Sequence, residues 1–157
     1  MPARLSPREW TLVGLVVAGL VLDAIVHFDL ASAFAGNKTS FISEAAIFRI
    51  QSTAALIAAA AVLLRPRRYT AALAFVIAAS AVVAVFVYRY VDVGKIGPIP
   101  NMYDPFWAPT GKWLSAIAEL VAALASGTLV LVLRGQSSVN GAASPPAPGR
   151  RSPSPAA

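Results

Sequence analysis

The chain has 157 residues, of which 57% are hydrophobic and only 13% are charged. Soluble domains are about one quarter charged, so this composition excludes an ordinary soluble fold. The net charge of +6 would suggest nucleic-acid binding in a soluble protein, but here its distribution is a topology signal, and we expect no nucleic-acid partner. The absence of cysteine excludes disulfides, thiol relays, iron–sulfur ligation and covalently attached haem.

Four apolar blocks follow one another along the chain. Each has about 20 residues, the length with which an α-helix crosses a hydrocarbon core of about 30 Å. The expected spans are 10–30, 45–64, 70–90 and 113–133. Residues 1–9 precede them, and the Pro/Ser/Ala-rich tail 135–157 is expected to be disordered because it has too few large apolar residues to bury a core. The predicted fold is all-α, a single transmembrane four-helix bundle embedded in a lipid bilayer.

Arginine is concentrated on one side of the predicted membrane. The N-terminus, the connection between the second and third spans, and the tail hold these arginines: Arg4, Arg8, Arg65, Arg67, Arg68, Arg134, Arg150 and Arg151. Glu9 is the only acid in those segments, whereas acids and lysines nearly balance in the other two loops. Because Lys/Arg excess marks the cytoplasmic face, both termini are expected in the cytoplasm.

The first span has an alternative interpretation as a secretory signal. Arg4 and Arg8 precede an apolar run, and Ala31-Ser32-Ala33 resembles a small-residue cleavage site. Three polar residues between the apolar run and that site argue against cleavage, so we expect the span to be retained.

Ionisable residues gather at the opposite, extracytoplasmic end of the spans. In chain order these residues are Asp23, His27, Asp29, Glu44, Arg49, Arg89, Asp92 and Glu119. Such groups are costly in lipid and are retained when they pair, line a cavity or take part in chemistry. This end of the bundle is therefore where the sequence places a function.

A layer of charge is predicted from depth. At 1.5 Å per residue, Asp23, Arg49 and Glu119 all lie about 10 Å below the outer boundary. His27, four residues after Asp23, shares its helical face, and Gln51 adds a further polar group. The expected cluster is either a buried ion network that fixes helix packing or an outward-facing pocket for a small anion, a headgroup, a quinone or a proton path.

The Asp23–His27 pair also leaves two interpretations open. It is either a hydrogen bond that orients the first helix or part of a proton relay. A metal site is the weakest alternative, because with one histidine and no cysteine the other ligands would have to be carboxylates from other helices. Haem held by two histidines is excluded within one chain, and we predict no metal and no cofactor.

The loop before the fourth span is unusual for a linker. Its segment 93–109 contains four prolines together with Met102, Tyr103, Phe106 and Trp107. These side chains either form an interfacial aromatic belt or cap the polar end of the bundle as one wall of a binding site. In either case we expect 98–109 to be ordered.

Two short patterns resemble small four-helix membrane proteins of high-GC bacteria. They are VHFDL at Val26–Leu30 and GPIPNMYDP at Gly97–Pro105, and in outline the chain is similar to DoxX-type proteins. The resemblance implies a fold and a location in the bacterial inner membrane, and it implies no reaction.

The expected role is a non-enzymatic accessory or structural subunit of an envelope complex. Small residues four apart in the fourth span, at Ala118, Ala122 and Ser126, allow close packing within the bundle or a homodimer contact. The alternative is a small-molecule binding or proton-coupled transport module that uses the charged cluster. A quinone- or haem-linked oxidoreductase subunit is a third possibility, although no motif supports an enzymatic activity.

Overall fold

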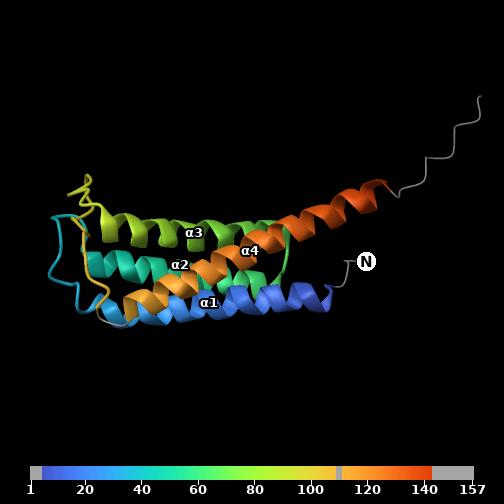
Figure 1. The fold of residues 1–157 in the computed structure, drawn as a ribbon, viewed down its shortest axis with the longest axis horizontal. Helices are drawn as coiled ribbons and strands as arrows, with labels where there is room; N and C mark the ends of the chain where they lie inside the picture. Colours follow the sequence, from blue (N-terminus) through green and yellow to red (C-terminus); the bar gives the residue numbers. More distant parts are fainter. Residues whose placement is uncertain (1–4, 109–110, 143–157) are drawn as a thin grey trace, which may run out of the picture.

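The computed structural model describes residues 5–108 and 111–142 and contains four helices in that part of the chain. They are α1 (Pro7–Ala31), α2 (Glu44–Leu64), α3 (Arg68–Tyr90) and α4 (Gly111–Ala142) (Figure 1). The helices run lengthwise, so the molecule has two ends. We call the end with segments 32–43 and 91–108 the loop end, and the end with the turn 65–67 and the start of α1 the turn end.

Local sequence explains where the first two helices begin. Ser6 caps α1 by accepting a hydrogen bond from the Glu9 amide, and the Glu9 carboxylate accepts one from the Ser6 amide at 2.6 Å. Ser43 caps α2 by accepting a hydrogen bond from the Ala46 amide at 3.1 Å. Both caps satisfy amides that have no partner within the helix.

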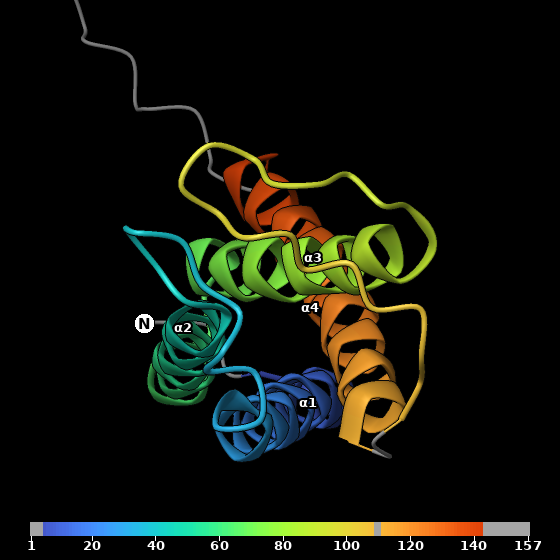
Figure 2. The same ribbon diagram turned by 90° about the vertical axis from the view of Figure 1, so that its left-hand side faces the viewer.

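The four helices form a ring rather than a layer (Figure 2). α1 packs against α2 and α4, α4 also packs against α3, and the contact between α2 and α3 is the sparsest of the four. α1 and α4 lie close together at Gly19, where an added Cβ would lie 2.7 Å from the Ala118 carbonyl oxygen and 3.0 Å from the Ala122 Cβ. The small-residue stripe of α4 is therefore used inside the bundle, against α1.

Side-chain size is distributed as in a protein that faces lipid. The buried core is rich in alanine. Among the described residues, Leu20 and Leu129 are the only apolar side chains larger than valine that are wholly buried. Large apolar side chains such as Ile57, Val76 and Leu124 are exposed instead. All four helices are long and apolar enough to cross a membrane, with mean hydropathy between 1.8 and 2.6. The chain is a multi-pass membrane protein with four candidate spans.

The helix bounds differ from the expected spans mainly at the ends. α4 continues through Gly135 to Ala142, into the segment that was expected to be disordered. A helix that projects beyond a bundle satisfies its backbone hydrogen bonds internally and does not have to bury a core. The pattern of apolar residues therefore could not predict this extension. The rest of the tail, 143–157, lies outside the described residues.

The two loops at the loop end are joined by hydrogen bonds. Thr39 Oγ1 donates to the Pro98 carbonyl at 2.6 Å, and Asn37 Nδ2 donates to the Asn101 carbonyl at 2.7 Å. The amide of Asp104 donates to the Tyr88 carbonyl at 3.0 Å, which holds the loop against the end of α3. As Figure 2 shows, the segment that follows α3 runs across this end of the ring.

Candidate functional site

Four polar side chains meet between α1 and α4 near the loop end. We call Asp23, His27, Ser115 and Glu119 the Asp–His–Glu cluster. Asp23 and Glu119 are wholly buried, Ser115 is 3% exposed, and the His27 side chain is 12% exposed. The helices bring these groups together because Asp23 and His27, like Ser115 and Glu119, are four residues apart and so share one face of their helix.

The hydrogen bonds of the cluster use one oxygen of each carboxylate. Ser115 Oγ donates to Asp23 Oδ1 at 2.6 Å, and His27 Nδ1 lies 2.7 Å from the same oxygen. Glu119 Oε1 lies 3.1 Å from Ser115 Oγ and 4.0 Å from His27 Nε2. The second oxygens, Asp23 Oδ2 and Glu119 Oε2, are buried and accept no hydrogen bond from an N–H or hydroxyl group of the described residues, and the two carboxyl groups lie close enough to hydrogen-bond to each other when one is protonated.

The negative charges of the cluster outnumber its possible positive charges unless protons or a cation are bound. Two carboxylates face a single imidazole, and no lysine or arginine in the described residues forms an ion pair with either acid. An unpaired charge in a low-dielectric interior is costly, so the carboxylates must take up protons or a cation. The Ser115 hydroxyl has one hydrogen and donates it to Asp23, so it accepts from Glu119 only when Glu119 carries a proton.

Arg49 does not join this cluster. It lies at the expected depth, but it is exposed on α2, and its guanidinium has no ion-pair partner in the described part of the chain. The expected layer of Asp23, Arg49 and Glu119 is therefore corrected: His27 and Ser115 take the place of the arginine. Depth along a helix fixes only one coordinate of a side chain, and the rotation about the helix axis turns Arg49 outward.

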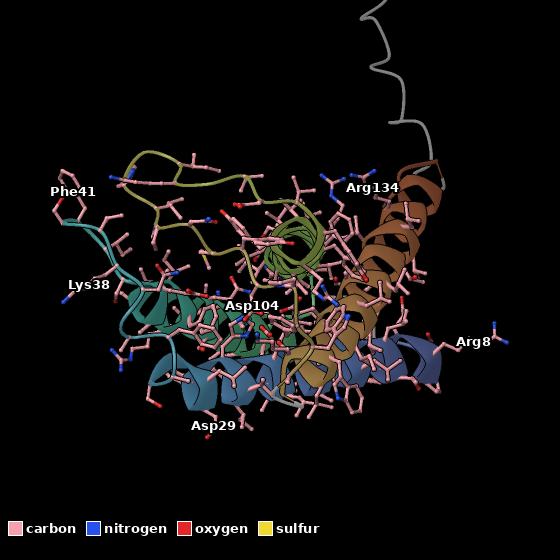
Figure 3. All side chains as sticks on the ribbon, turned by 60° about the vertical axis from the view of Figure 1, so that its left-hand side comes forward. Arg8, Asp29, Lys38, Phe41, Asp104 and Arg134 are labelled. Atoms are coloured by element: carbon pink, nitrogen blue, oxygen red, sulfur yellow. The ribbon has the colours of Figure 1, made fainter. Side chains whose placement is uncertain are left out.

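The other ionisable candidates lie in three different environments. Asp29 is exposed and points away from the bundle (Figure 3). Asp92 accepts hydrogen bonds from the Gly94 amide and from Asn101 Nδ2, so it shapes the loop. Glu44 is buried and accepts from Asn37 Nδ2 at 2.6 Å.

A cavity of about 340 Å³ lies beside the cluster at the loop end. All four helices and the loop after α3 line it, and its aromatic and apolar lining includes Phe34, Phe48, Tyr88, Met102, Phe106 and Trp107. His27 and Ser115 also line it, so the cluster forms part of its wall. Tyr103 does not line the cavity and is 38% exposed.

Two polar groups on the cavity wall lack a partner. Arg89 lies between the rings of Tyr90 and Trp107, with its Cζ 5.1 and 5.2 Å from their centroids. Its Nε is buried and makes no hydrogen bond with the described residues, and the same is true of Gln51 Nε2. Both are donors on residues that line a mainly apolar cavity, and because each atom has almost no accessible surface, a small side-chain rotation must turn it toward a molecule in the cavity.

Two further charged residues of the cavity wall, Lys112 and Asp104, neutralise each other. Lys112 forms an ion pair with Asp104 and lies over the Phe34 ring, with Nζ 5.1 Å from its centroid. The ion pair joins the loop to the start of α4, and it leaves Arg89 as a cation without an ion-pair partner among the described lining residues.

Two parts of this site were not expected from the sequence. Ser115 was not placed in the cluster, although its spacing of four from Glu119 repeats that of Asp23 and His27. Lys112 and Asp104 come together only through the path of the loop, for which the sequence contains no local signal.

No known family, curated protein or solved structure matches the chain. Four long apolar helices are consistent with a small four-helix membrane protein.

Proposed function

We propose that the chain is a membrane-embedded binding module for a small, largely apolar molecule that carries a hydrogen-bond acceptor. The observation that carries this proposal is the pair of buried donors without partners, Arg89 Nε and Gln51 Nε2, on the wall of one cavity. A buried donor left unsatisfied costs about 1–3 kcal/mol, so an acceptor on a bound molecule would recover that cost at both positions.

The size and lining of the cavity fit such a ligand. Small-molecule sites have volumes of about 300–1,000 Å³ and are mostly apolar with a few placed polar groups. At about 340 Å³, this cavity is at the small end of that range, which favours a ligand with a short hydrocarbon or single-ring body. Trp107 and Phe106 line it from the loop, which supports the cap interpretation of that loop.

We propose that the site faces out of the cytoplasm of a bacterial cell. Arg8 and Arg134 lie at the turn end, and Lys38 lies at the loop end (Figure 3). The arginine excess of the turn end therefore favours cytoplasmic termini and an extracytoplasmic cavity. The resemblance to DoxX-type proteins agrees with an inner-membrane location. An accessory role beside a partner has less support, because the small residues suited to a homodimer are used against α1.

A matched pair of probes tests the acceptor. The purified protein in detergent is heated with either a medium-chain ketone or the alkane of the same length, and unfolding is followed by circular dichroism. The ketone should raise the unfolding midpoint and the alkane should not, since only the ketone accepts hydrogen bonds. The double variant Gln51→Leu/Arg89→Met removes both donors at similar volume and should lose the response to ketone.

Two outcomes would contradict the proposal. One is an equal effect of ketone and alkane, which would mean that the probes only partition into the apolar surface. The other is a ketone response that the double variant retains in full. Asp29→Asn, which changes an exposed carboxylate outside the cavity, provides the control variant.

A further inference from the structure

We propose that the Asp–His–Glu cluster is a binding site for a divalent transition-metal ion of the zinc class. Asp23, His27 and Glu119 each offer one ligand atom, and these atoms lie within 4.8 Å of one another. Zinc takes nitrogen and oxygen ligands at about 2.0–2.2 Å, so rotation of these side chains toward a common centre would place the three atoms around one ion. This site does not depend on the proposed cavity ligand.

The unpartnered oxygens provide the independent reason for a cation. Asp23 Oδ2 and Glu119 Oε2 belong to wholly buried side chains, and neither accepts a hydrogen bond from an N–H or hydroxyl group of the described residues, so either a cation or a proton shared between the two carboxyl groups must satisfy them. The other two buried carboxylates of the described residues have donors: Glu9 accepts from the Ser6 amide and Glu44 accepts from Asn37 Nδ2. The two acids that lack donors are therefore the two that lie beside the histidine, where a metal ion would accept their lone pairs.

Charge selects a divalent ion. Two carboxylates carry two negative charges, and the imidazole must be neutral to ligate, so a doubly charged cation makes the site neutral. Arg49 is exposed, and Arg89 has no ion-pair partner in the described residues, so neither supplies that charge. Without a metal, protons on the acids and the histidine are what remains to neutralise them.

Ligand chemistry narrows the choice of metal. The set contains one imidazole nitrogen, carboxylate oxygens and the nearby Ser115 hydroxyl, and it contains no sulfur. Calcium prefers six to eight oxygen ligands, and magnesium retains several waters, which this buried pocket between two helices does not favour. Among first-row ions, imidazole with carboxylate suits zinc, iron and manganese.

The cavity gives the ion a route into the bundle. His27 and Ser115 belong to the cluster and also line the cavity, whereas Asp23 and Glu119 do not line it. An ion that enters through the cavity therefore reaches His27 and Ser115 before the two carboxylates. Within the described part of the chain, three side chains offer strong ligands here, which leaves a coordination position for water or another small ligand.

Zinc titration of the tag-free full chain tests the site. The detergent-purified protein is stripped with a chelator and titrated with Zn²⁺ against a chromophoric competitor. We expect about one tightly bound ion per chain and a loss of affinity of at least about 100-fold in His27→Gln and Glu119→Gln. Asp29→Asn, an exposed carboxylate on the same helix as His27, should bind zinc as the wild type does.

A measurement on the wild type alone guards against variants that fail to fold. Co²⁺ in a site of low coordination number gives intense visible bands, whereas hydrated Co²⁺ absorbs weakly. Intense bands that Zn²⁺ abolishes are the expected result. Weak, water-like absorbance, binding of far less than one ion, or equal binding by His27→Gln would overturn the proposal and assign the cluster to protons. The ketone response of the cavity is measured without metal, so failure of either proposal leaves the other distinguishable.

Discussion

Replacing Gly19 by alanine tests a close contact between α1 and α4. The new Cβ would lie 2.7 Å from the Ala118 carbonyl oxygen, closer than such atoms approach in proteins. The obstacle is backbone, which cannot rotate away as a side chain can, so α1 and α4 must separate. Overpacking of this kind costs about 1–3 kcal/mol. Separation would also lengthen the 2.6 Å bond between Asp23 and Ser115, since Asp23 lies one helical turn from Gly19.

Gly14→Ala is the matched control for this change. Gly14 is in the same helix, and a Cβ added there meets nothing within 4 Å. Both variants gain the helix propensity of alanine over glycine, about 1 kcal/mol, so this gain cancels in their difference. Gly19→Ala should therefore be less stable than Gly14→Ala by about 1–3 kcal/mol in denaturant unfolding followed by circular dichroism in detergent. Equal stability of the two variants would refute the close α1–α4 contact.

Three further predictions concern the surface, the loops and the topology. Arg49→Ala should change the free energy of unfolding by less than about 0.5 kcal/mol, because the side chain is exposed and has no ion pair within the described residues. A larger loss of stability would show that Arg49 does interact with Asp23 and Glu119. Asn37→Ala removes the hydrogen bonds that Asn37 donates to Glu44 and Asn101, so it should speed proteolysis of the loop after α3. Lys38→Ala, at an exposed neighbouring position, should not. Equal proteolysis rates of the two variants would mean that Asn37 does not join the loops. A reporter active only outside the cytoplasm should work when fused after Lys38 and fail after Arg68, and the reverse pattern would invert the proposed orientation.

The fold could be predicted because membrane spans need only length and hydropathy. Four apolar blocks with charges at their ends are sufficient to indicate a bundle, and the structure confirms four helices of that character. The small residues of α4 also predicted a close helix contact, but the sequence did not show which helix they would contact. Gly19 of α1 becomes the partner of α4 only when the two helices are placed side by side.

The composition of the site depended on information that spacing does not contain. Depth placed Asp23 and Glu119 in one layer because distance along a helix is a simple count. Rotation about the axis decides which residues of that layer face inward. Phe48 lines the cavity, whereas Arg49, about 100° further round α2, is exposed. The cavity itself requires the loop after α3 to lie over the bundle, which local sequence does not determine.

The closely packed pair α1 and α4 carries the Asp–His–Glu cluster, and the sparsely packed pair α2 and α3 contributes to the cavity. Filling the cavity tests whether the two sites are separate in this way. α1 and α4 pack closely and hold the cluster, whereas α2 and α3 make the sparsest contact and both contribute cavity-lining residues, including the unpartnered donors. Ala84→Leu adds three carbon atoms to a cavity of about 340 Å³, so it should be accommodated with little change in stability. It should weaken the ketone response while zinc affinity stays within about twofold of the wild type, because Ala84 lies on α3 and both zinc-ligating helices are untouched. Val83→Leu, on the exposed face of the same helix, should change neither measurement. Loss of zinc binding in Ala84→Leu with an intact ketone response would show that the two sites are not divided between the two sides of the ring in this way.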